Sequence, residues 1–114
     1  MAAGDVTYDG DITIGRGERG NMRIVTGTVV LDGGNPTPVA LAGYLSAIYG
    51  ATACMSGSAA TGADPNQVTA LINGTTLDIY AWKITTGGAA GNATEIASTD
   101  NARVINWMAM GPKA

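Results

Sequence analysis

The chain has 114 residues, of which glycine, alanine and threonine fill 50 positions and large apolar side chains only 32. Charged residues make up 13% of it and the net charge is −3, which argues against a nucleic-acid binder, since such a protein needs a basic surface. It contains no histidine, so Ser-His-Asp and Cys-His catalysis and histidine metal sites are excluded, and its length suits a single domain.

The first third of the chain is its most charged part. Eight of the fifteen charged residues precede Gly33, and the N-terminus lacks the basic start and apolar run of a signal peptide. We therefore expect a flexible, polar N-terminal arm and loop over residues 1–20, followed by one domain over residues 21–114. Three aspartates of this arm lack the spacing of an EF-hand and are interpreted as solvated turn residues, not as a metal site: Asp5, Asp9 and Asp11.

A glycine-rich segment, Gly15–Gly20, matches the pattern Gly-x-Gly-x-x-Gly and follows a plausible strand at Asp11–Ile14. A dinucleotide site needs a helix after this pattern, but the next residues have the pattern of a strand. The segment therefore predicts a hairpin loop and no bound cofactor. Its charged side chains and a nearby arginine are candidates for docking onto a neighbouring protein, because arginine forms bidentate pairs with carboxylates: Arg16, Glu18, Arg19 and Arg23.

The next segments predict one long strand and one ambiguous element. Residues Asn21–Leu31 are rich in β-branched side chains and end at Asp32-Gly33-Gly34, a turn-forming sequence that two prolines follow. In Leu41–Met55, leucine, isoleucine and tyrosine recur at helical spacing, whereas alanines and Met55 alternate as they would on a strand. Helix and strand both stay open here, and the alternation favours a strand.

The uncharged stretch Gly33–Ala63 is not expected to cross or contact a membrane, because prolines open it and small residues dilute its apolar ones. The chain has one cysteine, Cys54, which cannot form an internal disulfide. Its neighbours Ala53 and Met55 are apolar, so we predict that Cys54 is a buried, unreactive small hydrophobe.

The clearest local signal lies in Val68–Ile84, where Asn73-Gly74 separates two apolar runs. Asn-Gly supplies the two positive-φ residues of a type I′ turn, so this segment predicts a β-hairpin. A glycine-rich connection at Thr85–Ala93 and a final strand at Ala102–Met110 follow. Short strands at this spacing predict an all-β fold, namely a single-domain antiparallel β-sandwich or a jelly-roll-like barrel with a flexible N-terminal arm.

Aromatic side chains on the predicted strands have two interpretations. Tyr80 and Trp82 share one face of the second hairpin strand, and Trp107 shares a face of the last strand with apolar residues. Because the chain lacks phenylalanine, both tryptophans are expected to fill the core, although exposed ones could stack on sugar rings or on a partner. Asp78 has no second carboxylate predicted to face it, so no catalytic pair is assembled and we do not expect an enzyme.

Several segments together resemble small virion proteins of tailed bacteriophages that decorate or cement the capsid: Gly27–Leu41, Thr76–Thr85, Ile96–Thr99 and Val104–Gly111. The first 26 residues have no counterpart in this resemblance. It implies a compact β fold, a homotrimer over a capsid symmetry axis, and the major capsid protein as partner. It also implies a place on the outer capsid surface of the virion, after assembly in the host cytoplasm.

The sequence therefore predicts a structural protein that bridges capsid subunits and stabilises the shell by burying additional surface. The charged residues Arg16, Glu18, Arg19 and Arg23 are the predicted capsid contacts. Two alternatives are a receptor- or glycan-binding module on a tail or fibre, and a tail or connector component. A glycan-binding module would expose Trp82 or Trp107, which distinguishes it from a decoration protein with both side chains in the core.

Overall fold

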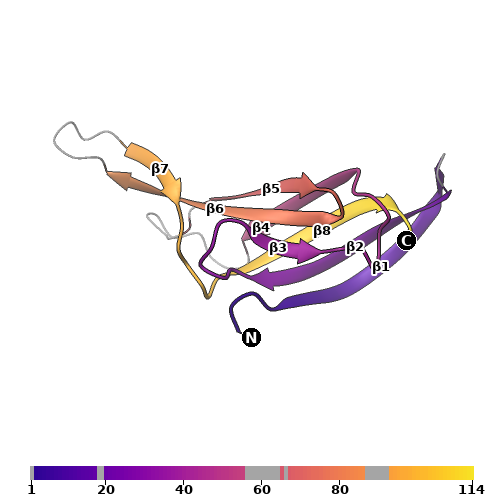
Figure 1. Cartoon of the computed structure of the whole chain (residues 1–114), viewed down its shortest axis with the longest axis horizontal. Coiled ribbons are helices and arrows are strands. Elements are labelled where there is room, and N and C mark those ends of the chain that lie inside the picture. Colours follow the sequence, from indigo (N-terminus) through magenta and orange to yellow (C-terminus); the bar gives the residue numbers. More distant parts are fainter. Residues whose placement is uncertain (1, 18–19, 56–64, 66, 87–92) are drawn as a thin grey trace.

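Two antiparallel β-sheets, sheet A and sheet B, pack face to face in this protein, which confirms the predicted all-β sandwich (Figure 1). The computed structural model describes residues 2–17, 20–55, 65, 67–86 and 93–114. Within these ranges all regular elements are strands. The molecule is elongated, with extents of 56 × 28 × 21 Å, because the β1–β2 hairpin and the β6–β7 pair extend toward opposite ends (Figure 1).

Sheet A has the strand order β1-β2-β8-β4. Its strands are β1 (Val6–Gly17), β2 (Gly20–Val30), β8 (Val104–Pro112) and β4 (Gly50–Met55). Residues 6–17, which the sequence analysis assigned to the N-terminal arm, form the edge strand β1 and pair with β2 along their length. The glycine-rich segment lies where β1 turns into β2, at the predicted hairpin, and a strand follows it.

Sheet B is built around β6. Its strands are β3 (Thr37–Ala40), β5 (Gln67–Asn73), β6 (Thr76–Thr86) and β7 (Ala93–Ala97). The amide of Ala81 donates to Asn35 Oδ1 (2.8 Å) and its carbonyl accepts from the Ser98 amide (2.9 Å). The amide and carbonyl groups of one strand residue point to the same edge of the strand. The segments next to β3 and β7 therefore bond the same edge of β6, one after the other, and β5 pairs with the opposite edge of β6.

The β5–β6 hairpin forms as predicted, but its turn differs. Asn73 pairs with Thr76, so the two central turn residues are Gly74 and Thr75. Gly74 has a φ of 63°, and no described residue other than glycine has a positive φ. This is the φ pattern of a type II′ turn, so the predicted type I′ turn centred on Asn73-Gly74 is wrong. Asn73 instead completes the ladder between the two strands.

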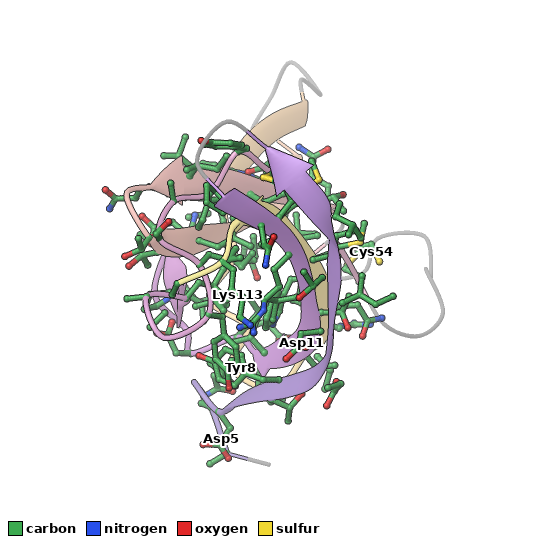
Figure 2. The ribbon with its side chains drawn as sticks, turned by 90° about the vertical axis from the view of Figure 1, so that its right-hand side faces the viewer. Asp5, Tyr8, Asp11, Cys54 and Lys113 are labelled. Atoms are coloured by element: carbon green, nitrogen blue, oxygen red, sulfur yellow. The ribbon has the colours of Figure 1, made fainter. Side chains whose placement is uncertain are left out.

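The ambiguous segment Leu41–Met55 contains one turn and one strand. The Leu45 amide donates to the Leu41 carbonyl (2.9 Å), which forms a single helical turn, and β4 begins only at Gly50. Alternation along β4 points Ala53 toward sheet B and Cys54 away from it. Cys54 is therefore exposed on the outer side of sheet A, and the prediction that it is buried is wrong (Figure 2).

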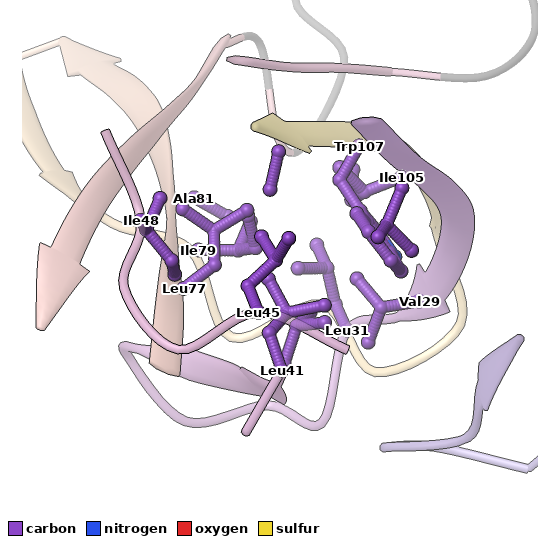
Figure 3. Packing of buried hydrophobic residues seen from close by; sticks show 13 residues of the cluster. Val29, Leu31, Leu41, Leu45, Ile48, Leu77, Ile79, Ala81, Ile105 and Trp107 are labelled. Atoms are coloured by element: carbon purple, nitrogen blue, oxygen red, sulfur yellow. The ribbon is translucent and has the colours of Figure 1, made fainter. Parts of the chain in front are cut away.

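The core lies between the sheets and contains thirteen buried side chains, drawn in Figure 3. They are Val25, Val29, Leu31, Val39, Leu41, Leu45, Ile48, Leu77, Ile79, Ala81, Ile105, Trp107 and Ala109. Trp107 is 3% exposed, so it fills the core as predicted. Its neighbour across the ladder is Gly27, where an added Cβ would lie 2.6 Å from Trp107 Cζ2. The indole therefore occupies the space that a side chain at Gly27 would need.

Candidate interaction surface

Two of the four predicted capsid contacts, Arg16 and Arg23, belong to the paired strands β1 and β2. Arg16 is part of β1, and Glu18 and Arg19 lie outside the described residues. Arg23 is half-buried on β2, and its Nη1 donates to the Tyr44 carbonyl (3.3 Å). The Nε of Arg23 is buried without a hydrogen-bond partner in the described structure. The Arg23 side chain thus makes a contact within the molecule.

Of the three predicted turn aspartates, only Asp5 precedes the strand, whereas Asp9 and Asp11 lie on β1, so the turn interpretation is wrong for these two. Asp5 Oδ2 accepts from the Ala2 amide (2.7 Å), and Asp9 Oδ2 accepts from the Thr7 hydroxyl (3.0 Å). Asp11 is exposed. Among the residues that the structure describes, no three histidine, cysteine, aspartate or glutamate side chains gather as a metal site would require.

Pairing in sheet A brings residues from distant parts of the sequence together on its outer side. One row crosses the sheet from β1 to β4 through Ile12, Ile24, Met110 and Gly50. The next row consists of Gly10, Thr26, Met108 and Thr52. A third row consists of Thr7, Thr28, Asn106 and Cys54. We call these twelve residues, none of which carries a charge, the outer face of sheet A.

Several side chains of this face are apolar and exposed. Ile12 is 58% exposed, Met108 42% and Met110 37%. Three shallow hollows lie between such side chains. One is bordered by Ile24, Gly50, Met108 and Met110, the second by Gly10, Ile12 and Thr26 with Asp11 at its margin, and the third by Thr52, Cys54 and Asn106. Two carboxylates lie at the β1 margin of this face, namely Asp9, which accepts from Thr7, and Asp11. The outer side of an antiparallel sandwich sheet is ordinarily polar, so the exposed apolar side chains inside this margin mark a contact surface.

The sequence analysis missed this face although β8 carried a signal for it. Trp107 and Ala109 point into the core, whereas Met108 and Met110 point outward, so the strand is apolar on both sides. Strands with two apolar sides are typical of sheets that are covered on both faces. This pattern predicts a second covering layer, which the chain itself does not supply over the described part of the outer face.

The β1 edge of sheet A is poorly suited to adding a strand from a partner. The ladder of β1 shifts register between Tyr8 and Gly10 and again between Thr13 and Gly15. Such irregularities, together with charged side chains like Asp11 on the strand, disfavour edge-to-edge pairing. A partner of sheet A is therefore expected to lie on its face and not along β1.

An aromatic cluster closes one side of the sandwich. The Tyr8 ring stacks on Tyr44 at a centroid distance of 4.6 Å and meets Trp107 edge to face at 5.7 Å. The Tyr8 hydroxyl donates to the Ala40 carbonyl (2.6 Å). Burial, and to a lesser extent the neighbouring Tyr44, raises the pKa of the Tyr8 phenol above its ordinary value.

The outer side of sheet B carries the other tryptophan. Trp82 is half-buried on the side of β6 that faces away from sheet A, so the prediction that it fills the core is wrong. Ala81, which precedes it, points into the core instead. The alternation of β6 therefore separates the two tryptophans, with Trp107 inside the sandwich and Trp82 on its surface.

No protein-family model, curated protein or solved structure matches this chain. The described residues contain no α-helix with the length and apolar character that a membrane crossing requires. The two outer sheet faces are thus the features from which a function can be argued.

Proposed function

We propose that this chain is a structural virion protein that decorates the capsid of a tailed phage and binds the outer surface of the major capsid protein lattice. The observation that carries the proposal is the uncharged, partly apolar outer face of sheet A. Covering such a face with a partner stabilises the complex by about 25 cal/mol per Å² of apolar surface that is buried. The resemblance to decoration proteins favours the capsid as that partner.

The size of this face favours an oligomer as the binding form. Three interstrand spacings and the distance from Ile24 to Thr28 on β2 give a flat area of about 15 Å by 14 Å, or roughly 200 Å². A stable interface buries about 800 Å² on each partner, so one copy would bind weakly. A homotrimer would present three such faces, and the second and third contacts would benefit from a high effective concentration.

The charged hairpin is proposed as a secondary contact. Glu18 and Arg19 connect β1 to β2, next to Arg16, and these strands also carry Ile12 and Ile24 of the outer face. Contacts through charges weaken as salt rises, whereas contacts through an uncharged face do not. Binding that is retained at high salt would therefore favour the outer face of sheet A over the hairpin as the main contact.

Cosedimentation with capsids that lack the chain tests this proposal directly. A charged side chain at Met108 should weaken capsid binding by tenfold or more, as about 1.4 kcal/mol of lost burial would. Leu71→Lys is the matched control for Met108→Lys, because Leu71 is an exposed apolar residue on the outer side of sheet B. Equal binding by the two variants would contradict a role for sheet A.

The number of copies in purified particles tests the location independently. Quantitative mass spectrometry should give a ratio to the major capsid protein near that of a shell subunit. A trace amount would instead favour a tail, fibre or connector component, and absence from particles would refute the virion assignment.

A further inference from the structure

The outer side of sheet B presents an ordered aromatic pair that the capsid proposal does not use. The rings of Tyr80 and Trp82 lie nearly parallel, 9° apart, with their centroids 6.0 Å from each other. Trp82 Nε1 donates to the Thr69 hydroxyl on β5 (3.1 Å). This cross-strand hydrogen bond fixes the orientation of the indole, so the pair is arranged before any ligand arrives.

A carboxylate lies next to this pair on the same side of β6. Asp78 precedes Tyr80 by two residues and is 7% exposed, between Leu71 on β5 and Pro38 on β3. Its Oδ2 accepts one hydrogen bond, from Asn73 Nδ2 (3.2 Å). Asp78 is buried and Asn73 is exposed, so the carboxylate fixes the Asn73 side chain, whose remaining amide N–H and oxygen can bond the hydroxyl groups of a ligand.

We infer that Tyr80, Trp82, Asp78 and Asn73 form a binding site for a neutral oligosaccharide. A sugar ring has apolar C–H faces and hydroxyl groups at its margin, which match aromatic rings and a carboxylate–amide pair respectively. Asp78 and the net charge of −3 disfavour an acidic sugar. A β-1,4-linked glucose chain fits best, because its linkages are equatorial as well as its hydroxyls, so the chain stays extended and each ring presents C–H groups on both faces.

The position of this site makes it independent of capsid binding. The outer sides of the two sheets point away from each other, because the sheets pack face to face (Figure 1). A copy held by the outer face of sheet A would present the oligosaccharide site on its opposite side. The isolated chain should bind the sugar equally well, so failure of either proposal leaves the other intact.

Isothermal titration calorimetry of the purified chain with cellopentaose, and separately with maltopentaose, tests this site. We expect binding of cellopentaose at millimolar concentrations, with a change in tryptophan fluorescence that comes from Trp82, since Trp107 is buried. Trp82→Ala should weaken binding at least about tenfold through loss of stacking, and Asp78→Asn should weaken it severalfold. Tyr49→Ala is the matched control, because Tyr49 is an exposed aromatic away from the site.

The outcomes separate this site from its alternatives. Binding of cellopentaose that Trp82→Ala abolishes and Tyr49→Ala retains would support the inference. A flat titration with both sugars for a protein that is folded by circular dichroism would overturn it and leave a protein contact for Tyr80 and Trp82. Binding that persists in Trp82→Ala, or that is confined to maltopentaose, would also overturn it.

Discussion

Gly27 and Gly111 are the described glycines without a positive φ at which an added Cβ would clash most closely, so replacing Gly27 with alanine should strongly destabilise the sandwich. A Cβ at Gly27 would lie 2.6 Å from Trp107 Cζ2 and closer still to the backbone carbonyl of Thr7. The Thr7 carbonyl is a backbone atom and cannot swing away as a side-chain tip can, so β1 must shift, and the buried Trp107 indole must move as well. Overpacking of this kind costs about 1–3 kcal/mol, and we expect the upper end of that range. A domain of this size has a free energy of unfolding of roughly 6–17 kcal/mol.

Urea unfolding followed by tryptophan fluorescence measures this loss. Gly43→Ala is the matched control, because a Cβ at Gly43 would meet nothing within 4 Å, and its free energy of unfolding should stay within about 0.5 kcal/mol of the parent. The urea midpoint of Gly27→Ala should fall well below that of Gly43→Ala, with a similar slope. Equal midpoints would refute the close approach of Thr7 and Trp107 to Gly27.

Three further predictions follow from individual contacts. Cys54 should react with Ellman's reagent in the native protein without prior unfolding, because it is exposed, and a lag that urea removes would contradict this. Asn35→Ala should lower the free energy of unfolding in urea by about 1–2 kcal/mol, because it leaves the Ala81 amide without its acceptor. A urea midpoint equal to that of the parent would contradict this. The raised pKa of Tyr8 contributes stability that is complete below the unfolded pKa, near 10, and is lost as pH rises through the folded pKa. Tyr8→Phe should therefore reduce the loss of stability at alkaline pH, and an unchanged pH dependence would argue against burial of this phenol.

Elements that depend on local sequence could be predicted. The strand over Asn21–Leu31 and the Val68–Ile84 hairpin follow from alternation and turn residues, and both exist. The short strands β3 and β7 were missed, because four or five residues carry little periodicity and Pro38 interrupts β3. Proline is tolerated there because β3 is an edge strand.

The candidate surface depends on pairing between distant segments, which periodicity does not specify. Ile24 and Met110 become neighbours only because β2 pairs with β8, and Gly50 joins them only because β4 pairs with the other edge of β8. Arg23 was instead predicted as a capsid contact because of its charge. The structure uses that side chain for a hydrogen bond to Tyr44, inside the molecule.

The distribution of large apolar residues links folding to assembly. The chain has only 32 of them, yet Ile12, Met108 and Met110 lie on the outer face of sheet A, where they add nothing to its own core. Each such side chain contributes about 1.5–3 kcal/mol when it is fully buried. Under the capsid proposal that free energy is gained only on docking, so binding should stabilise the folded chain and the occupied lattice together. A protein selected to function as an isolated chain would be more stable with those side chains in its core and polar residues at their surface positions.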